Sequence, residues 1–177
     1  MAHRVFQAEL SVKGIEQLKK DLRNYKVNIL QQRVNRLAQL LAERGVDIAQ
    51  VNVTKLNAIF TGDLLKSIHT RYGGGKNGGA VFYIVADSDH AVFVEFGTGQ
   101  LGLEGGYPYP FPPGIKWDYN TGKTIFEISP GQYGWFYPGK DGQWYFTQGM
   151  PARPFMYETA VELERQYEQI AREVFAK

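Results

Sequence analysis

Residues 91–99 read Ala-Val-Phe-Val-Glu-Phe-Gly-Thr-Gly, and the rest of the chain is best interpreted around this stretch. Large apolar residues alternate with small or charged ones until the run stops at Gly-Thr-Gly. Such a period of two predicts a strand with one buried face. Two glycines around a threonine predict a sharp chain reversal or a close backbone approach. Glu95 lies near the end of the predicted strand, and its carboxylate is expected either in solvent or in a specific pair.

A second stretch, Gly-Met-Pro-Ala-Arg-Pro-Phe-Met at 149–156, precedes a single-sided apolar pattern. That pattern predicts a last helix from about residue 155 to residue 175. Prolines near Arg153 order the backbone around it, and a guanidinium suits bidentate contact with a carboxylate. We therefore predict that the two stretches meet and that Glu95 pairs with Arg153, either within the chain or across a subunit boundary.

The overall composition limits the classes of protein to consider. With 177 residues, the chain fits one domain, 1–177, that is large enough to bury a core. It has no cysteine, which excludes disulfides and thiol chemistry. A formal charge of +2 argues against a dedicated nucleic-acid binder. No apolar run approaches the ~20 residues of a membrane helix, and the first residues lack a signal-peptide core. We expect a soluble protein made inside the cell.

The remaining periodicities predict an α+β fold. Alternation predicts a first strand at 6–12, and helical spacing of Ile15, Leu18 and Leu22 follows it. A long amphipathic helix is expected at about 30–48. Strands are expected at 68–72 and 80–86 around a glycine-rich hairpin tip. With residues 91–99 as a third strand, we predict an antiparallel sheet packed on a long N-terminal helix and a C-terminal helix.

Residues 102–149 differ from the rest of the chain because Pro, Gly and aromatic residues crowd together there. We predict a loop-and-hairpin insertion on the same sheet, with strands at 123–128, 133–137 and 144–147. Its aromatics include Trp135, Tyr137 and Trp144. Three interpretations stay open for them: a satellite core under the hairpins, a protein interface, or stacking on bases or sugars.

The chain lacks the usual signatures of catalysis. It has neither a Gly-x-Ser-x-Gly elbow nor a His-Glu-x-x-His motif. The glycine-rich loop at 73–79 departs from the phosphate-loop pattern. Asp-Ser-Asp-His at 87–90 fits a polar turn better than a metal shell. We expect no enzymatic activity, no cofactor and no metal site.

Three motifs in order resemble those of the HK97 gene-product-10-like family of tailed-phage proteins. They are Thr-Gly-Asp-Leu-Leu-Lys-Ser-Ile at 61–68, Phe-Val-Glu-Phe-Gly-Thr-Gly at 93–99 and Pro-Ala-Arg-Pro-Phe-Met at 151–156. Family members are tail-completion, neck or minor tail proteins. They are similar to tail terminators, which are α+β subunits that form rings, commonly of six. The insertion at 102–149 is longer and more aromatic than a minimal member needs.

The resemblance implies a structural subunit of the virion at the head–tail junction, assembled in the host cytoplasm. Its implied partners are copies of itself and other neck or tail-tube proteins, with DNA only passing through the channel. Neither a membrane nor a small-molecule substrate is implied. The competing hypothesis is an aromatic-rich binding module for glycan or single-stranded nucleic acid. The residues expected at structural or interface positions are Glu95, Phe96, Gly97, Thr98, Gly99, Arg153, Pro154, Phe155, Trp135, Tyr137 and Trp144.

Overall fold

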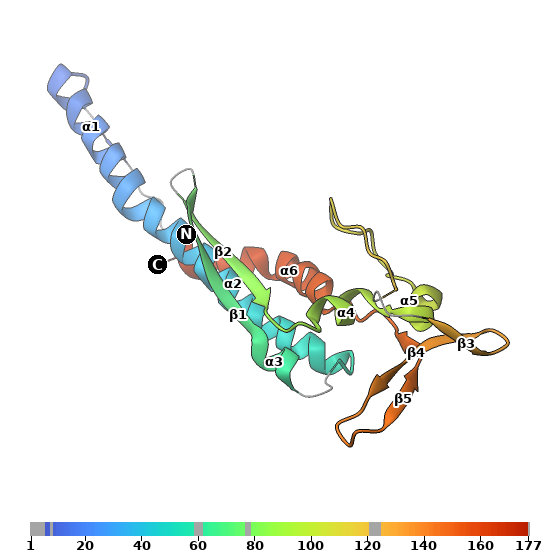
Figure 1. Ribbon diagram of the computed structural model, residues 1–177. Helices are drawn as coiled ribbons and strands as arrows, with labels where there is room; N and C mark the ends of the chain where they lie inside the picture. The colour runs from blue at the N-terminus through green and yellow to red at the C-terminus, as the bar shows by residue number, and fades with distance from the viewer. Residues whose placement is uncertain (1–5, 8, 59–61, 77–78, 121–124, 177) are drawn as a thin grey trace. The chain divides into compact units, whose positions relative to one another are not determined.

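A computed structural model describes residues 6–7, 9–58, 62–76, 79–120 and 125–176, and its helices and antiparallel strands form an α+β fold (Figure 1). The elements in chain order are α1 (Val12–Asn24), the π-helix η1 (Tyr25–Leu30), α2 (Gln31–Lys55), α3 (Asp63–Ser67), β1 (Ile68–Lys76), β2 (Gly79–Ala86), α4 (Ala91–Phe96), α5 (Gly99–Gly105), β3 (Phe126–Ser129), β4 (Gln132–Pro138), β5 (Trp144–Thr147), β6 (Gly149–Met150) and α6 (Phe155–Phe175). The expected class is therefore correct.

The chain divides into two compact units, each built from segments far apart in the sequence. The first unit takes its described residues from 1–48, 69–85 and 160–177, and the second takes them from 49–68 and 86–159. Helices α2 and α6 each contribute residues to both units. The expectation of one domain over 1–177 with an insertion at about 102–149 stays a prediction.

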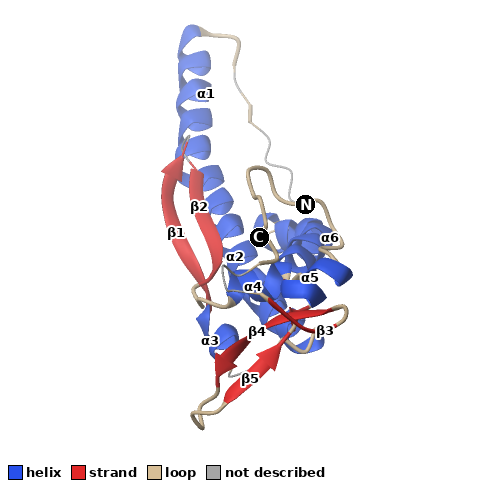
Figure 2. Ribbon diagram, turned by 45° about the vertical axis from the view of Figure 1, so that its right-hand side comes forward, coloured by secondary structure: helices blue, strands red, loops and turns tan. Residues whose placement is uncertain are grey.

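In the first unit, the β1–β2 sheet packs on α2 and α6, and Figure 2 shows the two strands beside α2. The Asn35 side-chain oxygen accepts a hydrogen bond from the Ala80 backbone N–H at 2.9 Å, which fixes β2 to α2. Gly45 of α2 is buried where the side chains of Ile84 and Leu163 come together. The predicted packing of a sheet on the N-terminal and C-terminal helices is present.

The predicted strand at 6–12 is wrong. Residues 6, 7, 9 and 10 lie in no strand, and Val12 already belongs to α1. Ser11 caps this helix, since its hydroxyl accepts a hydrogen bond from the Gly14 N–H at 3.1 Å. An isolated strand has no partner for its backbone groups, whereas a capped helix satisfies them internally. The helical path continues through η1 and α2 to Lys55, and Gly45 does not interrupt it.

Strands β1 and β2 confirm the predicted pair, but the third predicted strand is wrong. Residues 91–96 form the helix α4, in which the His90 carbonyl accepts from the Val94 N–H at 3.0 Å. Val94, Glu95 and Phe96 are consecutive and all buried. Because the helix is covered on several sides, the alternation in its sequence does not report one buried face. Burial by surrounding segments therefore overrides the β propensity of the run.

The insertion contains the expected strands in a sheet of their own. β3, β4 and β5 form a three-stranded antiparallel sheet that is separate from the β1–β2 sheet, so the expected attachment to that sheet is wrong. Strands β4 and β5 match their predicted positions closely, and β3 begins later than predicted. Residues 123 and 124 of that prediction lie outside the described residues.

We predict that Gly45→Val destabilises the protein. A Cβ atom at this position would lie 2.2 Å from Ile84 Cδ1 and 2.9 Å from Leu163 Cδ1, so the substitution overpacks the first unit. The free energy of unfolding should fall by about 1–3 kcal/mol, measured by urea denaturation followed by circular dichroism. Ala160→Val at an exposed helical position is the control and should have a smaller effect. Equal effects of both substitutions would contradict the packing.

Candidate functional site

Glu95 is a buried acid whose carboxylate accepts three hydrogen bonds. Its Oε2 atom accepts from the Met156 N–H at 2.8 Å, and its Oε1 atom accepts from the Tyr157 N–H at 3.2 Å. The Tyr107 hydroxyl donates to the same Oε1 atom at 3.0 Å. Met156 and Tyr157 lie in the first turn of α6, where backbone N–H groups have no partner within the helix. Glu95 therefore caps α6 from a distant part of the sequence.

The predicted pairing of Glu95 with Arg153 is wrong within the chain. Among the described residues, the Glu95 carboxylate bonds to helix amides and a tyrosine, and no ion pair joins it to the Arg153 guanidinium. Arg153 contributes its backbone N–H instead, which donates to the Val94 carbonyl at 2.8 Å. A helix N-terminus supplies amides and a favourable dipole without burying a second ion. The two stretches meet as expected, and pairing across a subunit boundary stays a prediction.

The Gly-Thr-Gly turn makes the close backbone approach that its sequence predicts. Thr98 and Gly99 form antiparallel bridges with Met150 and Gly149, and the buried Thr98 hydroxyl accepts from the Met150 N–H at 3.2 Å. Gly97 has φ +80°, and a Cβ atom there would lie 2.7 Å from the Ala152 nitrogen. Any side chain would therefore be strained and would push the two segments apart.

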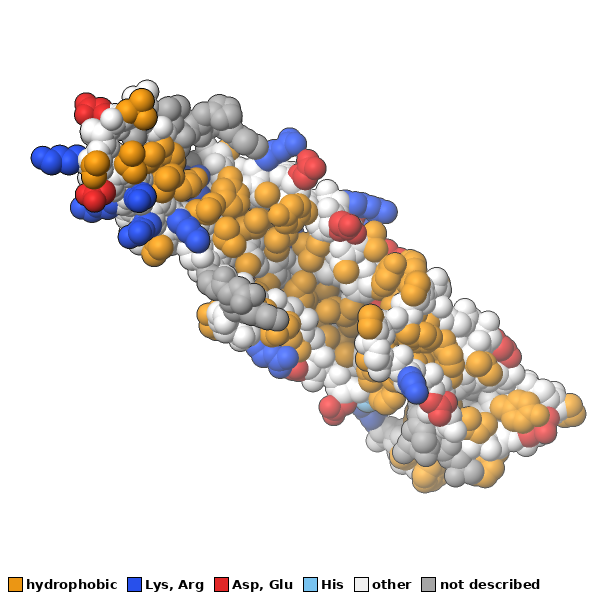
Figure 3. Space-filling view, turned by 90° about the horizontal axis from the view of Figure 1, so that it is seen from above, with side chains coloured by type: hydrophobic (Ala, Val, Ile, Leu, Met, Phe, Trp, Pro, Cys, Tyr) orange, Lys and Arg blue, Asp and Glu red, His pale blue; other side chains and the backbone are white. Residues whose placement is uncertain are grey.

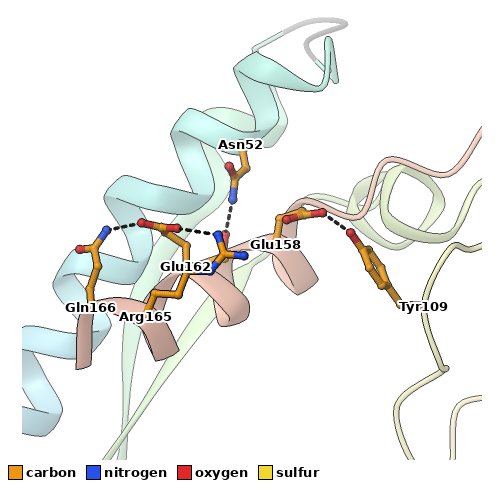
Figure 4. Close-up of polar contacts among 7 residues, drawn as sticks. Asn52, Tyr109, Glu158, Glu162, Arg165 and Gln166 are labelled. Atoms are coloured by element: carbon orange, nitrogen blue, oxygen red, sulfur yellow. Dashed lines mark hydrogen bonds and ion pairs between the residues drawn. The ribbon is translucent and has the colours of Figure 1, made fainter. Parts of the chain in front are cut away.

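Pro154 and Phe155 are both buried, and they fix the start of α6. Phe155 is fully buried, and its carbonyl accepts from the Thr159 hydroxyl at 2.7 Å. Asn52 of α2 donates from its side-chain nitrogen to the same hydroxyl at 3.2 Å, as Figure 4 shows. Both residues were expected at structural or interface positions, and this expectation stays a prediction.

The first motif, at 61–68, also lies in the second unit. Gly62 is the N-cap residue of α3 with φ +79°, and Asp63, one of the two residues expected to cap it, is the first residue of the helix. Thr61 lies outside the described residues. Leu64 and Ile68 are buried, and the Ser67 carbonyl accepts from the Asp87 N–H at 3.3 Å. Leu64 and Ile68 of this motif therefore belong to the core, and Ser67 contacts Asp87, which precedes α4 in the chain.

Four aromatic residues pack against one another beside Glu95. The Phe96 ring lies 4.9 Å from that of Tyr107, 5.5 Å from Phe111 and 5.3 Å from Trp117, measured between centroids. The Trp117 indole N–H donates to the Gly97 carbonyl at 2.9 Å. Tyr107 and Trp117 are partly buried against Phe96, which agrees with the satellite-core interpretation for these two residues, whereas Phe111 is 38% exposed. Tyr107 was not predicted as a partner of Glu95, because nothing in the spacing of the two residues indicates the contact.

Tyr109 links the same cluster to α6. Its ring stacks on that of Tyr157 with centroids 3.7 Å apart, and its hydroxyl donates to the Glu158 carboxylate (Figure 4). Glu158 in turn lies near enough to Glu95 to act on it electrostatically. Two tyrosines of the insertion therefore bind acids at this junction: Tyr107 binds Glu95 of α4, and Tyr109 binds Glu158 in the first turn of α6.

The aromatics of β4 and β5 form a second group, which is mostly exposed. Trp144 is 67% exposed, and Phe136 and Tyr137 are each more than two-fifths exposed. The register places Phe136 opposite Phe146 and Tyr137 opposite Tyr145. Trp135 is partly buried, and its ring would lie 2.7 Å from a Cβ atom added at Gly99. Figure 3 shows hydrophobic side chains exposed over much of one face. The hairpin thus presents apolar area that its own chain does not cover.

Burial raises the pKa of the Glu95 carboxyl above its usual value, although the three hydrogen bonds oppose the shift. Burial and the neighbouring Glu95 also raise the pKa of Tyr107. A buried acid with a shifted pKa is a feature of many catalytic sites. Here its donors are two amides of α6 and one tyrosine, which is the arrangement of a helix cap. Among the described residues, no three His, Asp or Glu side chains gather as a metal site would require.

A search of protein-family models found no match to the chain, and comparisons with curated proteins and with solved structures found none either. In the described part of the chain, no helix combines the length and the apolar character needed to cross a membrane. The candidate site therefore has to be interpreted from its own geometry.

We predict that Glu95→Ala costs about 3 kcal/mol of unfolding free energy, because it leaves buried donors without an acceptor and removes a helix cap. Arg153→Gln should cost less than about 1 kcal/mol, because Arg153 contacts Val94 through its backbone N–H and the substitution keeps that bond. The double variant should lose the sum of the two values, measured by chemical denaturation. A large coupling energy between the two sites would instead indicate an ion pair.

We predict a specific pH dependence of stability. The folded state holds the Glu95 proton more tightly than the unfolded state, so the unfolding free energy should fall as the pH rises above 4.5 towards the raised pKa. The Glu95→Gln variant should lack this contribution. The difference in unfolding free energy between the wild type and Glu95→Gln, measured by denaturation from about pH 4 to 8, should therefore depend on pH. A constant difference would contradict the assignment.

Proposed function

We propose that the chain is a structural subunit of a tailed bacteriophage virion, a tail-completion, tail-terminator or neck protein that assembles into a ring at the head–tail junction. The observation that carries the proposal is the position of the three motifs at 61–68, 93–99 and 151–156. Their described residues all belong to the second unit, although more than eighty residues separate the first motif from the last. The second and third motifs contact each other directly, since Glu95 accepts from the Met156 N–H and the Val94 carbonyl accepts from the Arg153 N–H.

The chemistry at this junction supports an architectural role. Glu95 caps a helix, the glycines permit close backbone approach, and Phe155 fills the core. These contacts build the second unit and require no substrate. A tail-terminator-like architecture is part of the proposal.

The exposed apolar surfaces also support assembly. A head-to-tail ring needs two different surfaces on each subunit, because each neighbour meets a different side. The chain has two separate candidates: the aromatic hairpin β4–β5 and the apolar side of α1. Both would leave large hydrophobic side chains in water if the chain worked as a monomer.

We predict that the purified protein, alone or with a tail-tube partner, forms closed rings visible by electron microscopy and of one mass by native mass spectrometry. Trp144→Ser should weaken this assembly or the contact with the partner, because Trp144 is an exposed aromatic and aromatics often anchor interfaces. Lys140→Ser, which also changes an exposed residue of this hairpin, is the control. A protein that stays monomeric under all these conditions would contradict the proposal.

The alternative is a binding module for glycan or single-stranded nucleic acid, and the exposed aromatics of β4 and β5 favour it. This alternative predicts that oligosaccharides or oligonucleotides quench the fluorescence of Trp144, which is exposed, more than that of the packed Trp117. Salt-sensitive quenching by a monomeric protein would replace the assembly proposal.

A further inference from the structure

Helix α1 has an apolar side that the described part of the chain leaves partly exposed. Ile15, Leu18 and Leu22 recur at spacings of three and four residues, which places them on one side of the helix. No residue of α1 is buried, and Ile15 and Leu22 are each 45% exposed. In globular proteins such a stripe normally faces a core, so this one requires a partner.

The charge around this stripe is basic. From Val12 to Leu30, α1 and η1 hold five Lys or Arg residues against two acids, a net charge of +3. Lys19 lies within one helical turn of both Ile15 and Leu22, at the edge of the stripe. Figure 3 shows Lys and Arg side chains beside hydrophobic ones at the end of the molecule that contains α1. A fitting partner is therefore apolar in the middle and acidic at its margin.

Helix α6 has the complementary surface. It holds five Glu residues against two Arg, a net charge of −3. Near its C-terminal end lies an open hollow of about 450 Å³, in whose lining Tyr167, Ala171 and Phe175 repeat every four residues. Glu168 and Arg172 both line the same hollow and form an exposed ion pair at 3.1 Å, and Tyr167 is 50% exposed. The hollow is apolar, and the excess of acids belongs to the helix as a whole.

We propose that α1 of one copy docks on α6 of a second copy of this chain. Ile15, Leu18 and Leu22 enter the hollow beside Tyr167, Ala171 and Phe175, and Lys19 lies close to Glu168 and shares its carboxylate with Arg172. The inference rests on the proposed ring assembly and names the contact that closes the ring. Because α1 and α6 are different surfaces, the contact is head-to-tail and can repeat around a ring.

Two other occupants fit the surfaces less well. A nucleic acid would neutralise the lysines of α1 but leave its apolar stripe in water. An anionic membrane would cover α1 but gives no role to the hollow on α6, a helix whose net charge is negative. Only a partner with an apolar, acidic surface matches both the stripe and its charge, and the chain itself provides one.

Leu22→Asp and Asn24→Asp form a matched pair of test variants. Each adds one negative charge to α1, and two residues apart on a helix they lie on opposite sides. Leu22→Asp should weaken self-association at least about tenfold, whereas Asn24→Asp should assemble like the wild type. The measurement is the dissociation constant from sedimentation or native mass spectrometry, with helix content checked by circular dichroism.

A charge-reversal series tests the partner surface. Lys19→Glu and Glu168→Lys should each weaken self-association by roughly fivefold, and the two changes combined in one chain should restore it. Restoration requires that position 19 of one copy lies near position 168 of the next. Losses that simply add would overturn the docking.

The outcomes distinguish the docking from the proposed function. Rings that form equally well with Leu22→Asp would overturn the docking and leave the ring assembly standing. A closed dimer that Leu22→Asp disrupts would support the docking and contradict the ring. A wild-type monomer that binds anionic phospholipid vesicles through Leu22 would overturn the docking in favour of a lipid surface.

Discussion

The carboxylate of Glu95 is the interaction on which the second unit depends. It joins three segments that are distant in the sequence: α4, the insertion through Tyr107, and the first turn of α6. Burying a carboxylate is costly unless donors replace its water. The amides of a helix N-terminus are suitable donors because they lack partners within the helix and carry a positive partial charge.

The backbone around this acid follows from the same constraint. For the carboxylate to reach the α6 amides, residues 97–99 and 148–152 must run close together, and glycine allows the approach. The aromatic rings of Phe96, Tyr107 and Trp117 then exclude water from the junction. Burial shifts the acid towards its protonated form, while the hydrogen bonds favour the carboxylate. The burial of Glu95 therefore affects both the stability of the second unit and the pKa of this acid.

Two exposed apolar surfaces, at Trp144 and along α1, favour the proposed assembly. The folded chain covers Phe96 and Trp117, yet it leaves Trp144 and the apolar side of α1 in water. An amphipathic helix with no buried residue gains little stability from its own chain, because most helical stability in proteins comes from tertiary packing. Opposite net charges on α1 and α6 make a second copy a suitable partner.

The meeting of the two motifs was expected from a Glu95–Arg153 ion pair that does not form within the chain. The sequence alone determined the α+β class, the long helices α2 and α6, and the strands of both hairpins. Each of these has a strong local signal: a 3.6-residue period, turn glycines, or a proline-flanked helix start. The sequence did not determine that residues 91–96 form a helix, because a short run buried on several sides shows no distinct period. Nor did it determine what Glu95 binds, since its main donors are backbone amides of Met156 and Tyr157. Every residue except proline carries such an amide, so only the tertiary structure decided which ones meet the acid.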